Sequence, residues 1–345
     1  MKTRIKLGLM ILVIIMVITG CNPAILIQEQ EVLPQASIED YYPFVSNRIL
    51  VYEGTGSEYA NALEYVDFKD HGSVQTRTVT DGTTLAKIFR FSENSVALTY
   101  AREEFYAWGT LFHLPDSRNE VLLKMPLEVG NEWVLEDGRI RTISETDVTV
   151  RTAAGSFKTL KVTTEGQGES VQHVYLAPGI GLVKTVFESD GMLIETTLKS
   201  IEDDAGFEIP IHIYYPEGDD EATASQLTLE VFHTNDSIEE KLTALFNEAP
   251  ADLFPVFPSD VQVRQVRVDP LNRNVKIDFS EEILNMNVGT YQEGRILQSV
   301  TNTLANFYDM DAVILTVEDG PYESGHYYIA PEDKLIPDYL NSKPL

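Results

Sequence analysis

The fold class of the first half of the chain is decided by Leu85-Ala86-Lys87-Ile88-Phe89-Arg90-Phe91 and, just after it, by Val96-Ala97-Leu98-Thr99-Tyr100. In each segment the residues fall into two alternating sets, and one set of the first segment is Leu85, Lys87, Phe89 and Phe91. This period of two is typical of β-strands with two unlike faces. Outward from this stretch, the same rhythm extends from about Glu39 to Ile201.

Turn signals separate the alternating runs. Asp81-Gly82, Asp137-Gly138 and Asp190-Gly191 suit tight hairpins because Asp-Gly readily adopts the positive φ angles that such turns need. Weaker signals of the same kind are His71-Gly72 and Ala154-Gly155. Residues 39–202 are therefore predicted to form an all-β domain, an antiparallel meander that makes a curved sheet or a barrel-like form. The part from Ser92 to Leu114 is less regular, and a short helix around Ala101–Tyr106 is an alternative there.

The rhythm changes after Asp203-Asp204-Ala205-Gly206. Strands are expected at Ile209–Tyr215, Leu227–Phe232, Val261–Val268, Val275–Phe279 and Ala312–Val317. One helix is expected to start at Asp236-Ser237-Ile238-Glu239, with Asp236 as its cap, and to end before Pro250; a longer one spans Thr290 to Tyr308. The order β-β-α-β-β-α-β predicts an α+β sandwich over residues 203–330, with two helices on one face of a small mixed sheet. Residues 331–345 are expected to be a tail that packs back and then frays.

The N-terminus has the features of an export signal. Lys2, Arg4 and Lys6 precede an apolar run from Leu7 to Ile18, which is shorter than a membrane-spanning helix. The following Ile18-Thr19-Gly20-Cys21 resembles a bacterial lipobox. That resemblance implies a signal peptide over residues 1–20, cleavage before Cys21 and acylation of the Cys21 thiol. Residues 21–38 are then expected to be a tether.

Charge and cysteine content exclude several classes of protein. The 345 residues carry 26 Lys and Arg against 54 Asp and Glu, and Cys21 is the only cysteine. One cysteine excludes an intrachain disulfide framework and a cysteine-based zinc site. The acidity argues against nucleic-acid binding and against an electrostatic grip on anionic lipid. Without residues 1–20 the net charge is −31, of which −20 lies in residues 202–345.

Motifs for catalysis or cofactor binding are missing from the sequence. It contains no Gly-x-Ser-x-Gly, His-Glu-x-x-His or phosphate-binding Gly-x-x-x-x-Gly-Lys pattern, and Gly166–Ser170 is expected to be a hairpin loop. None of the histidines is paired at metal-ligand spacing: His71, His113, His173, His212, His233 and His326. Adjacent carboxylates such as Glu103-Glu104 and Glu281-Glu282 point in different directions. The acidic runs Asp203-Asp204 and Asp219-Asp220-Glu221 are either weak calcium sites or solvated linkers. We therefore predict no catalytic residue, no cofactor and no metal site.

Aromatic side chains gather in the first half, at Tyr41, Tyr42, Tyr100, Tyr106 and Trp108. They are either ordinary strand residues or the lining of a glycan or lipid cleft. Three phrases resemble a β-rich domain of secreted bacterial lipoproteins, namely Tyr41-Tyr42-Pro43, Pro126–Trp133 and Tyr175–Lys184.

The second half resembles the GerMN domain of bacterial sporulation and germination proteins. The resemblance covers about residues 209–320 and rests on Ile211–Tyr215, Ile238–Phe246, Phe257-Pro258-Ser259-Asp260, Val275–Ser280 and Ile296–Leu304. It implies a non-catalytic envelope role, and by analogy of fold it suggests assembly into homo-oligomers.

Together these observations predict a lipoprotein on the extracellular face of a bacterial cytoplasmic membrane, held there through Cys21. It is expected to bind or scaffold in envelope or spore assembly or in germination, with envelope proteins, spore proteins or peptidoglycan as partners. Two alternatives stay open. One is a cell-wall glycan enzyme or accessory that uses carboxylates of the β-rich domain. The other is a carrier of a small molecule or lipid, if that domain closes around an apolar cavity.

Overall fold

The computed structural model describes residues 36–166, 168, 170–216, 223–250, 253–258 and 260–344. Cys21, the signal peptide and most of the tether lie outside the described residues, as do Gln167, Glu169 and the acidic run 219–221. Ala36 and the residues after it form one compact unit. Within the described residues, no helix is both long enough and apolar enough to cross a membrane.

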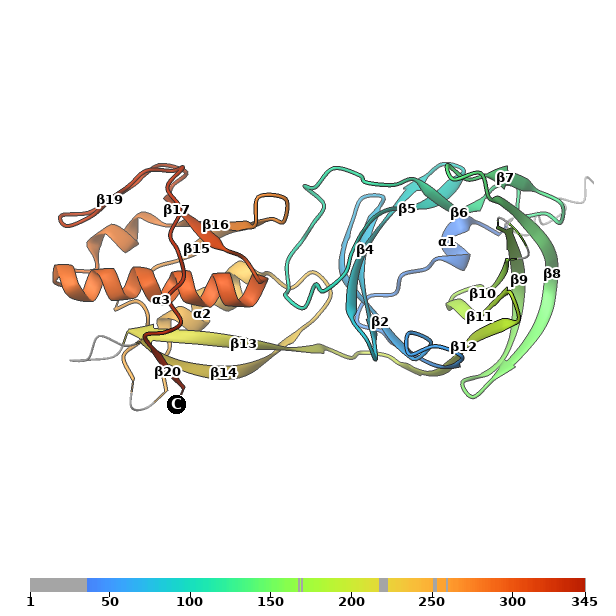
Figure 1. Ribbon diagram of the computed structural model, residues 1–345, viewed down its shortest axis with the longest axis horizontal. Helices are drawn as coiled ribbons and strands as arrows, with labels where there is room; N and C mark the ends of the chain where they lie inside the picture. Colours follow the sequence, from blue (N-terminus) through green and yellow to red (C-terminus); the bar gives the residue numbers. More distant parts are fainter. Residues whose placement is uncertain are drawn as a thin grey trace, which may run out of the picture. The chain divides into compact units, whose positions relative to one another are not determined.

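A twelve-stranded antiparallel sheet, here called the curved sheet, makes up the first part of this unit (Figure 1). Its strands are β1 (Ile49–Thr55), β2 (Ala62–Asp70), β3 (Ser73–Thr80), β4 (Thr84–Ser92), β5 (Ser95–Arg102), β6 (Glu120–Lys124), β7 (Glu132–Val134), β8 (Ile140–Thr152), β9 (Gly155–Glu165), β10 (Val171–Ala177), β11 (Gly181–Ser189) and β12 (Met192–Glu202). They lie in the order β6-β5-β4-β3-β2-β1-β12-β11-β10-β9-β8-β7, so nearly all neighbours are consecutive in the chain. The predicted meander is confirmed, and the sheet is nearly closed.

Side chains join the two edge strands of the curved sheet. On β7 the indole Nε1 of Trp133 donates to the carbonyl of Val121 on β6 at 3.0 Å. On β8 the guanidinium of Arg141 donates to the same carbonyl at 2.7 Å. These bonds give a hydrogen-bond partner to a backbone carbonyl on an edge strand of the sheet, where strand pairing is incomplete.

The hairpin signals are confirmed, whereas the alternative helix is wrong. All five signals lie where one strand of the sheet passes to the next, and Gly72, Gly138, Gly155 and Gly191 have positive φ there, whereas Gly82 does not. At Ala101–Tyr106 the chain instead continues β5 to Arg102, which pairs with Ala86, and Phe105 then donates its N–H to the Thr84 carbonyl at 3.1 Å. Because these backbone groups bond to β4 and its start, they are not available for helical bonds. Residues 103–119 cross to β6 as a loop.

The concave side of the curved sheet holds a core that includes the N-terminal segment. Helix α1 (Ile38–Tyr41) is capped by Ser37, whose hydroxyl accepts from the N–H of Asp40. The sheet has two arms, β1–β6 and β7–β12. After α1, Phe44 is buried among strand residues from both arms, including Phe89 on β4 and Leu176 on β10. We call residues 36–48 the inner segment. On the convex side, β2 to β4 share a second core with the rest of the unit.

The second part has the predicted element order. It comprises β13 (Phe207–Pro216), β14 (Thr223–Phe232), α2 (Ile238–Asn247), β15 (Val263–Asp269), β16 (Asn274–Phe279), the 3₁₀ turn η1 (Glu281–Asn285), α3 (Thr290–Tyr308) and β17 (Ala312–Val317). The short strands β18 (Tyr322–Glu323), β19 (Tyr328–Ile329) and β20 (Ser342–Pro344) follow.

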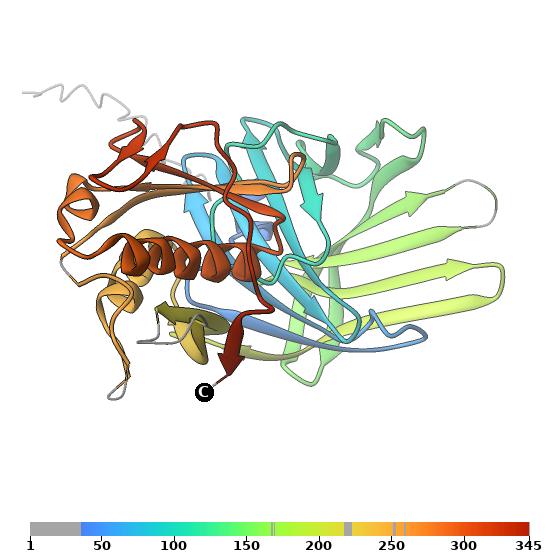
Figure 2. The same cartoon turned by 60° about the vertical axis from the view of Figure 1, so that its left-hand side comes forward.

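The arrangement of these elements corrects three expectations. Two three-stranded sheets, β13-β14-β20 and β15-β16-β17, replace the single mixed sheet. Helix α3 contacts β13 as well as β16 and β17, and Figures 1 and 2 show it between the two sheets, which explains why it is buried on more than one side. The cap of α2 is Ser237, because the carboxylate of Asp236 accepts from the N–H of His233. The last residues do not fray, since β20 pairs in parallel with β14.

Candidate functional site: a cavity inside the curved sheet

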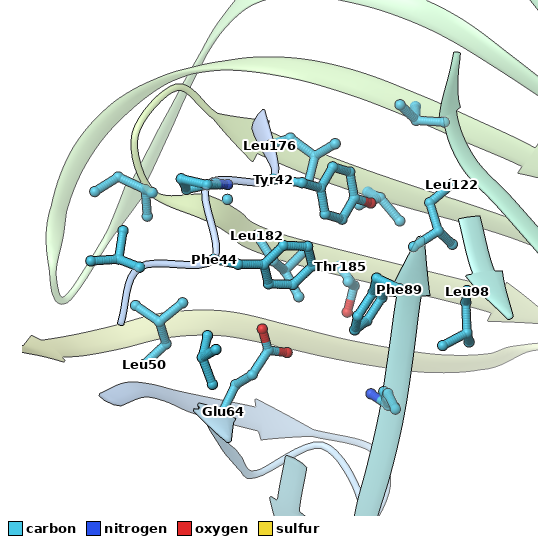
Figure 3. Close-up of a pocket in the computed structure, with 18 of the residues that line it drawn as sticks. Tyr42, Phe44, Leu50, Glu64, Phe89, Leu98, Leu122, Leu176, Leu182 and Thr185 are labelled. Carbon is cyan, nitrogen blue, oxygen red and sulfur yellow. The ribbon is translucent and has the colours of Figure 1, made fainter. Parts of the chain in front are cut away.

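A cavity of about 280 Å³ lies on the concave side of the curved sheet (Figure 3). Its volume is just below the range of about 300–1,000 Å³ that is usual for small-molecule sites. The inner segment and strands from both arms of the sheet line it: Tyr42, Pro43, Phe44, Val45, Arg48, Leu50, Glu64, Tyr65, Val66, Lys87, Phe89, Leu98, Glu120, Leu122, Arg141, Val162, Gln172, Val174, Leu176, Ile180, Gly181, Leu182 and Thr185. The lining is mainly aliphatic and aromatic, with a few charged and amide groups.

Phe44 is the main aromatic wall that the inner segment contributes. Its ring centroid lies 4.8 Å from that of Phe89 on β4 and 5.9 Å from that of Tyr42. Its φ of 39° lies in the left-handed region, which bulky side chains avoid. The buried ring holds the backbone in this unfavourable conformation, as often happens where a chain is shaped around a site.

Two charged side chains face the cavity without a protein partner. Glu64 is on β2 and is in register with Thr78 of β3, while Lys87 is on β4 and is in register with Thr76 of β3. Glu64 and Lys87 both line the cavity, and Figure 3 shows the Glu64 carboxylate pointing into it near Phe44. Among the described residues, neither side chain makes a hydrogen bond or an ion pair within 4.0 Å.

The pKa values of these two groups respond to the same causes in opposite directions. Burial raises the pKa of the Glu64 carboxyl, and the positive charge of Lys87 opposes part of that rise. Burial lowers the pKa of the Lys87 ammonium, and the charges of Glu64 and Glu120 oppose that change. Both groups are thus desolvated charges that attract each other across the cavity.

Arg141 and Glu120, which also line the cavity, form an ion pair whose guanidinium is fully engaged in hydrogen bonds. Arg141 donates to the Glu120 carboxylate at 2.8 Å and to the Thr164 hydroxyl at 2.9 Å, besides its bond to the Val121 carbonyl. These bonds occupy the guanidinium in joining β8 to β6. Burial also raises the pKa of Tyr42, so its hydroxyl is neutral and can donate a hydrogen bond.

Few side chains of the lining are candidates for covalent or acid–base chemistry. The described residues around the cavity include no serine, cysteine or histidine. The two carboxylates of the cavity, Glu64 and Glu120, are nearest to the enzyme alternative, but Glu120 is held by Arg141. In the part of the chain that the structure describes, no group of three or more His, Cys, Asp or Glu residues could hold a metal ion.

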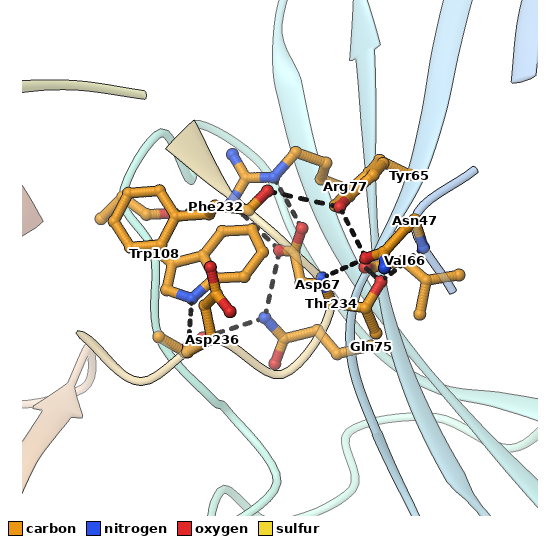
Figure 4. A network of polar contacts seen from close by, with 12 residues as sticks. Asn47, Tyr65, Val66, Asp67, Gln75, Arg77, Trp108, Phe232, Thr234 and Asp236 are labelled. Atoms are coloured by element: carbon orange, nitrogen blue, oxygen red, sulfur yellow. Dashed lines mark hydrogen bonds and ion pairs between the residues drawn. The ribbon is translucent and has the colours of Figure 1, made fainter. Parts of the chain in front are cut away.

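A second buried polar cluster lies on the convex side (Figure 4). Arg77 donates to both oxygens of Asp67, at 2.7 and 3.0 Å, and to the Ala107 carbonyl at 2.9 Å. Its guanidinium also lies 5.3 Å from the ring centroid of Trp108. Trp108 stacks on Phe232 with centroids 4.7 Å apart and donates to the Asp236 carbonyl. Because its members satisfy one another, the cluster is a structural joint between the curved sheet and the second part.

The structure separates most of the side chains that the sequence singled out. Of the five aromatic residues, Tyr42 lines the cavity, Trp108 is buried on the convex side and Tyr106 is 57% exposed, so no common glycan cleft forms. The pairs Glu103-Glu104 and Glu281-Glu282 are exposed. Asp203 pairs with Arg48 at 2.6 Å, in agreement with a linker role.

Three residues of interest were not identified from the sequence. Glu64 and Lys87 occupy inward positions of strands, and the signal for Lys87 was a charge in the same alternating set as Phe89 and Phe91. His326, for which the histidine spacing predicts no metal-ligand role, binds the carboxylate of the buried Glu293 at 2.6 Å.

Residues 212–323 match the family model described as "Germane: Sporulation and spore germination". No curated protein matches the chain. Among solved structures, the first GerMN domain of the sporulation protein GerM from Bacillus subtilis is 22% identical, with a TM-score of 0.27, and the match covers 37% of this chain and 97% of that one. The tandem GerMN domains of the same protein are 17% identical, with a TM-score of 0.27, and the match covers 38% of this chain and 46% of that one. A Bacteroides fragilis protein, provisionally named as an exported protein with a YmcC-like fold, is 15% identical, with a TM-score of 0.32. That match covers 46% of this chain and 97% of the other.

Proposed function

We propose that this chain, in which residues 212–323 form a Germane domain, is a non-catalytic binding protein of the bacterial envelope. In this proposal the curved sheet holds a small ligand and the Germane domain docks on envelope or spore partners. The family match supports an association with sporulation at a general level. Acylation of Cys21 would hold the chain on the extracellular face of the cytoplasmic membrane, which charge alone would not do at a net −31.

The observation that carries the binding role is the composition of the cavity. It is lined by apolar side chains from the inner segment and from both arms of the sheet, and it holds two charges that have no protein partner. Such an arrangement is typical of ligand sites, in which a few polar groups orient a largely apolar ligand.

A filled-cavity variant tests this role. Leu98→Trp adds an indole ring to the lining, and Val134→Trp adds one at a strand position that is 68% exposed. With the full-length chain in nanodiscs, indole is added as a small apolar probe and saturation-transfer NMR reports its binding. We expect the wild type and Val134→Trp to bind indole and Leu98→Trp to lose most of the binding. Equal signals from all three proteins would contradict the proposal, and so would a wild type that binds neither indole nor any of the zwitterionic probes described below.

A second candidate role is homo-oligomer assembly, and an exposed stripe on β14 favours it. Leu227, Leu229 and Val231 alternate along β14 and are 51%, 62% and 41% exposed. In the described chain, β20 pairs only with Thr223–Ser225, so the remaining edge of β14 is open. Open edges with apolar side chains are templates for pairing with another strand. Light scattering of wild type and Leu229→Lys tests this role: we expect an oligomer that the substitution disrupts, and a monomeric wild type would contradict it.

A further inference from the structure

Five charged side chains line the cavity, and three of them have partners. Arg48 pairs with Asp203, outside the lining, at 2.6 Å. Glu120 and Arg141 are bonded to each other at 2.8 Å. Glu64 and Lys87 bring one negative and one positive charge into the same space and make no bond to each other or to other described residues. An apolar ligand would leave both charges without a partner, and a ligand with one charge would satisfy only one of them. Both side chains are half-buried, and an apolar ligand that displaced water from the cavity would leave each charge unpaired, which is costly.

We propose that the ligand of this cavity is a small zwitterion with an apolar body. Its ammonium group lies against the Glu64 carboxylate, and its anionic group, a carboxylate or a phosphate, lies against the Lys87 ammonium. This inference rests on the proposed binding function and specifies the chemistry of its ligand. The class includes free amino acids with apolar side chains and the headgroup of an amine-bearing phospholipid.

The strand register supports room for both ends of such a ligand. Glu64 and Lys87 are on β2 and β4, which flank β3, so their strands are about 10 Å apart. Between them on β3 lie Thr76 and Thr78, in register with Lys87 and Glu64 respectively. The hydroxyls of both threonines are buried and have no hydrogen-bond partner among the described residues. A polar ligand anchored between the two charges would lie over this polar strip.

The rest of the cavity suits the apolar body. The rings of Phe44 and Phe89 form one wall at a centroid distance of 4.8 Å, and Leu98 and Leu122 extend the apolar lining. The neutral hydroxyl of Tyr42 adds one donor. Burial, which works against the ionised form of each of the two free groups, also strengthens their attraction to a counter-charge.

Isothermal titration calorimetry with the full-length chain in nanodiscs tests the proposal. The probes are leucine and phenylalanine, each compared with its N-acetyl derivative, which lacks the ammonium, and its methyl ester, which lacks the carboxylate. Lysophosphatidylethanolamine is a third zwitterion and distinguishes a lipid source from a free amino acid. We expect at least one zwitterion to bind about tenfold or more tightly than its singly charged analogues, since truncating one partner of a desolvated charge pair is expensive.

Variants assign each end of the ligand. Glu64→Gln should remove the preference for the ammonium, and Lys87→Met should remove the preference for the acidic group. The charge-swapped pair Glu64→Lys/Lys87→Glu should recover zwitterion binding, which a merely unfolded protein would not. Lys158→Met is the matched control, because Lys158 is 64% exposed and lies on the same sheet. It should bind as the wild type does.

Two outcomes separate this inference from the function on which it rests. If indole binds in the cavity but zwitterions bind no better than their analogues, the zwitterion assignment is wrong and the binding function stands. If neither indole nor any zwitterion binds, both fail.

Discussion

Arg77 on β3 and Asp67 on β2 form an ion pair with an N–O distance of 2.7 Å, and neither side chain is more than 1% exposed. The pair stands on the convex side of the curved sheet, where Gln75 and the carbonyl of Ala107 complete its hydrogen bonds. The same strands carry Glu64 and Thr78 on their other face. One pair of strands therefore presents a closed polar cluster to the protein interior and open polar groups to the cavity.

The first prediction concerns this ion pair. Arg77→Met leaves the Asp67 carboxylate buried and uncompensated, so we expect it to lower the free energy of unfolding by about 3–5 kcal/mol. Adding Asp67→Leu to Arg77→Met should recover most of that loss. Urea denaturation of the two variants measures both effects. Arg90→Met is the control, because the ion pair of Arg90 with Asp116 is partly exposed and should contribute about 1 kcal/mol or less. Equal losses for Arg77→Met and Arg90→Met would contradict the prediction.

The second prediction is that the open charges of the cavity reduce stability. Glu64 and Lys87 are half-buried, burial works against the ionised form of each, and among the described residues they form no ion pair within 4.0 Å. The double variant Glu64→Gln/Lys87→Met should therefore be as stable as the wild type, or more stable by about 1–3 kcal/mol, while it loses the ligand. Denaturation of the ligand-free proteins measures the difference. A double variant less stable than the wild type by several kcal/mol would mean that the two charges are structural.

The sequence is sufficient for the elements but not for the cavity. The alternation around Lys87 and Phe89 predicts a strand because residues two positions apart in a strand lie on the same face, so a few neighbouring residues suffice to show the pattern. The bounds of α3 follow equally well from a local period, and they agree at Thr290 and Tyr308. By contrast, the meeting of Glu64 and Lys87 depends on the register of β2, β3 and β4 together.

Local patterns also missed contacts that are distant along the chain. The inner segment lies on the concave side through packing of Phe44 against β4 and β10, and nothing in its own sequence specifies that position. The expectation that residues 331–345 fray rests on the general behaviour of chain ends. Asn302 on α3 nevertheless bonds with its side chain to both the N–H and the carbonyl of Asp338, and β20 follows. The domain boundary at residue 203 stays a prediction.

The third prediction uses the backbone conformation of Phe44. Replacing Phe44 with alanine removes a buried ring and should cost about 3–4 kcal/mol. Replacing it with glycine removes slightly more, but glycine adopts a φ of 39° without strain. Phe44→Gly should therefore be at least as stable as Phe44→Ala. At Phe89 on β4, where φ is not in the left-handed region, the order should reverse, with glycine less stable than alanine by about 1 kcal/mol. Chemical denaturation of the four variants measures both differences. Glycine variants less stable than the alanine variants at both sites would contradict strain at Phe44.

The fourth prediction concerns Glu293, which is 3% exposed and lies on α3. Tyr322 donates to one carboxylate oxygen and the imidazole of His326 binds the other, each at 2.6 Å. Burial alone would raise the pKa of Glu293, but bonds with Ser324, Tyr322 and His326 outweigh it, so the pKa is lowered. A carboxyl group whose pKa is lowered by folding stabilises the protein above its unfolded-state pKa. That contribution is lost as the pH falls through the folded-state pKa.

Glu293→Gln should consequently reduce the free energy of unfolding by about 2 kcal/mol at pH 7. The gap to the wild type should narrow as the pH falls below about 4, near the ordinary pKa of glutamate. Denaturant titrations at several pH values between 7 and 3 measure this gap. Glu323→Gln is the control, since Glu323 is exposed on neighbouring β18 and should show little effect at any of these pH values. A gap for Glu293→Gln that stays constant over this range would show that the ionised carboxylate contributes nothing beyond what the neutral amide supplies.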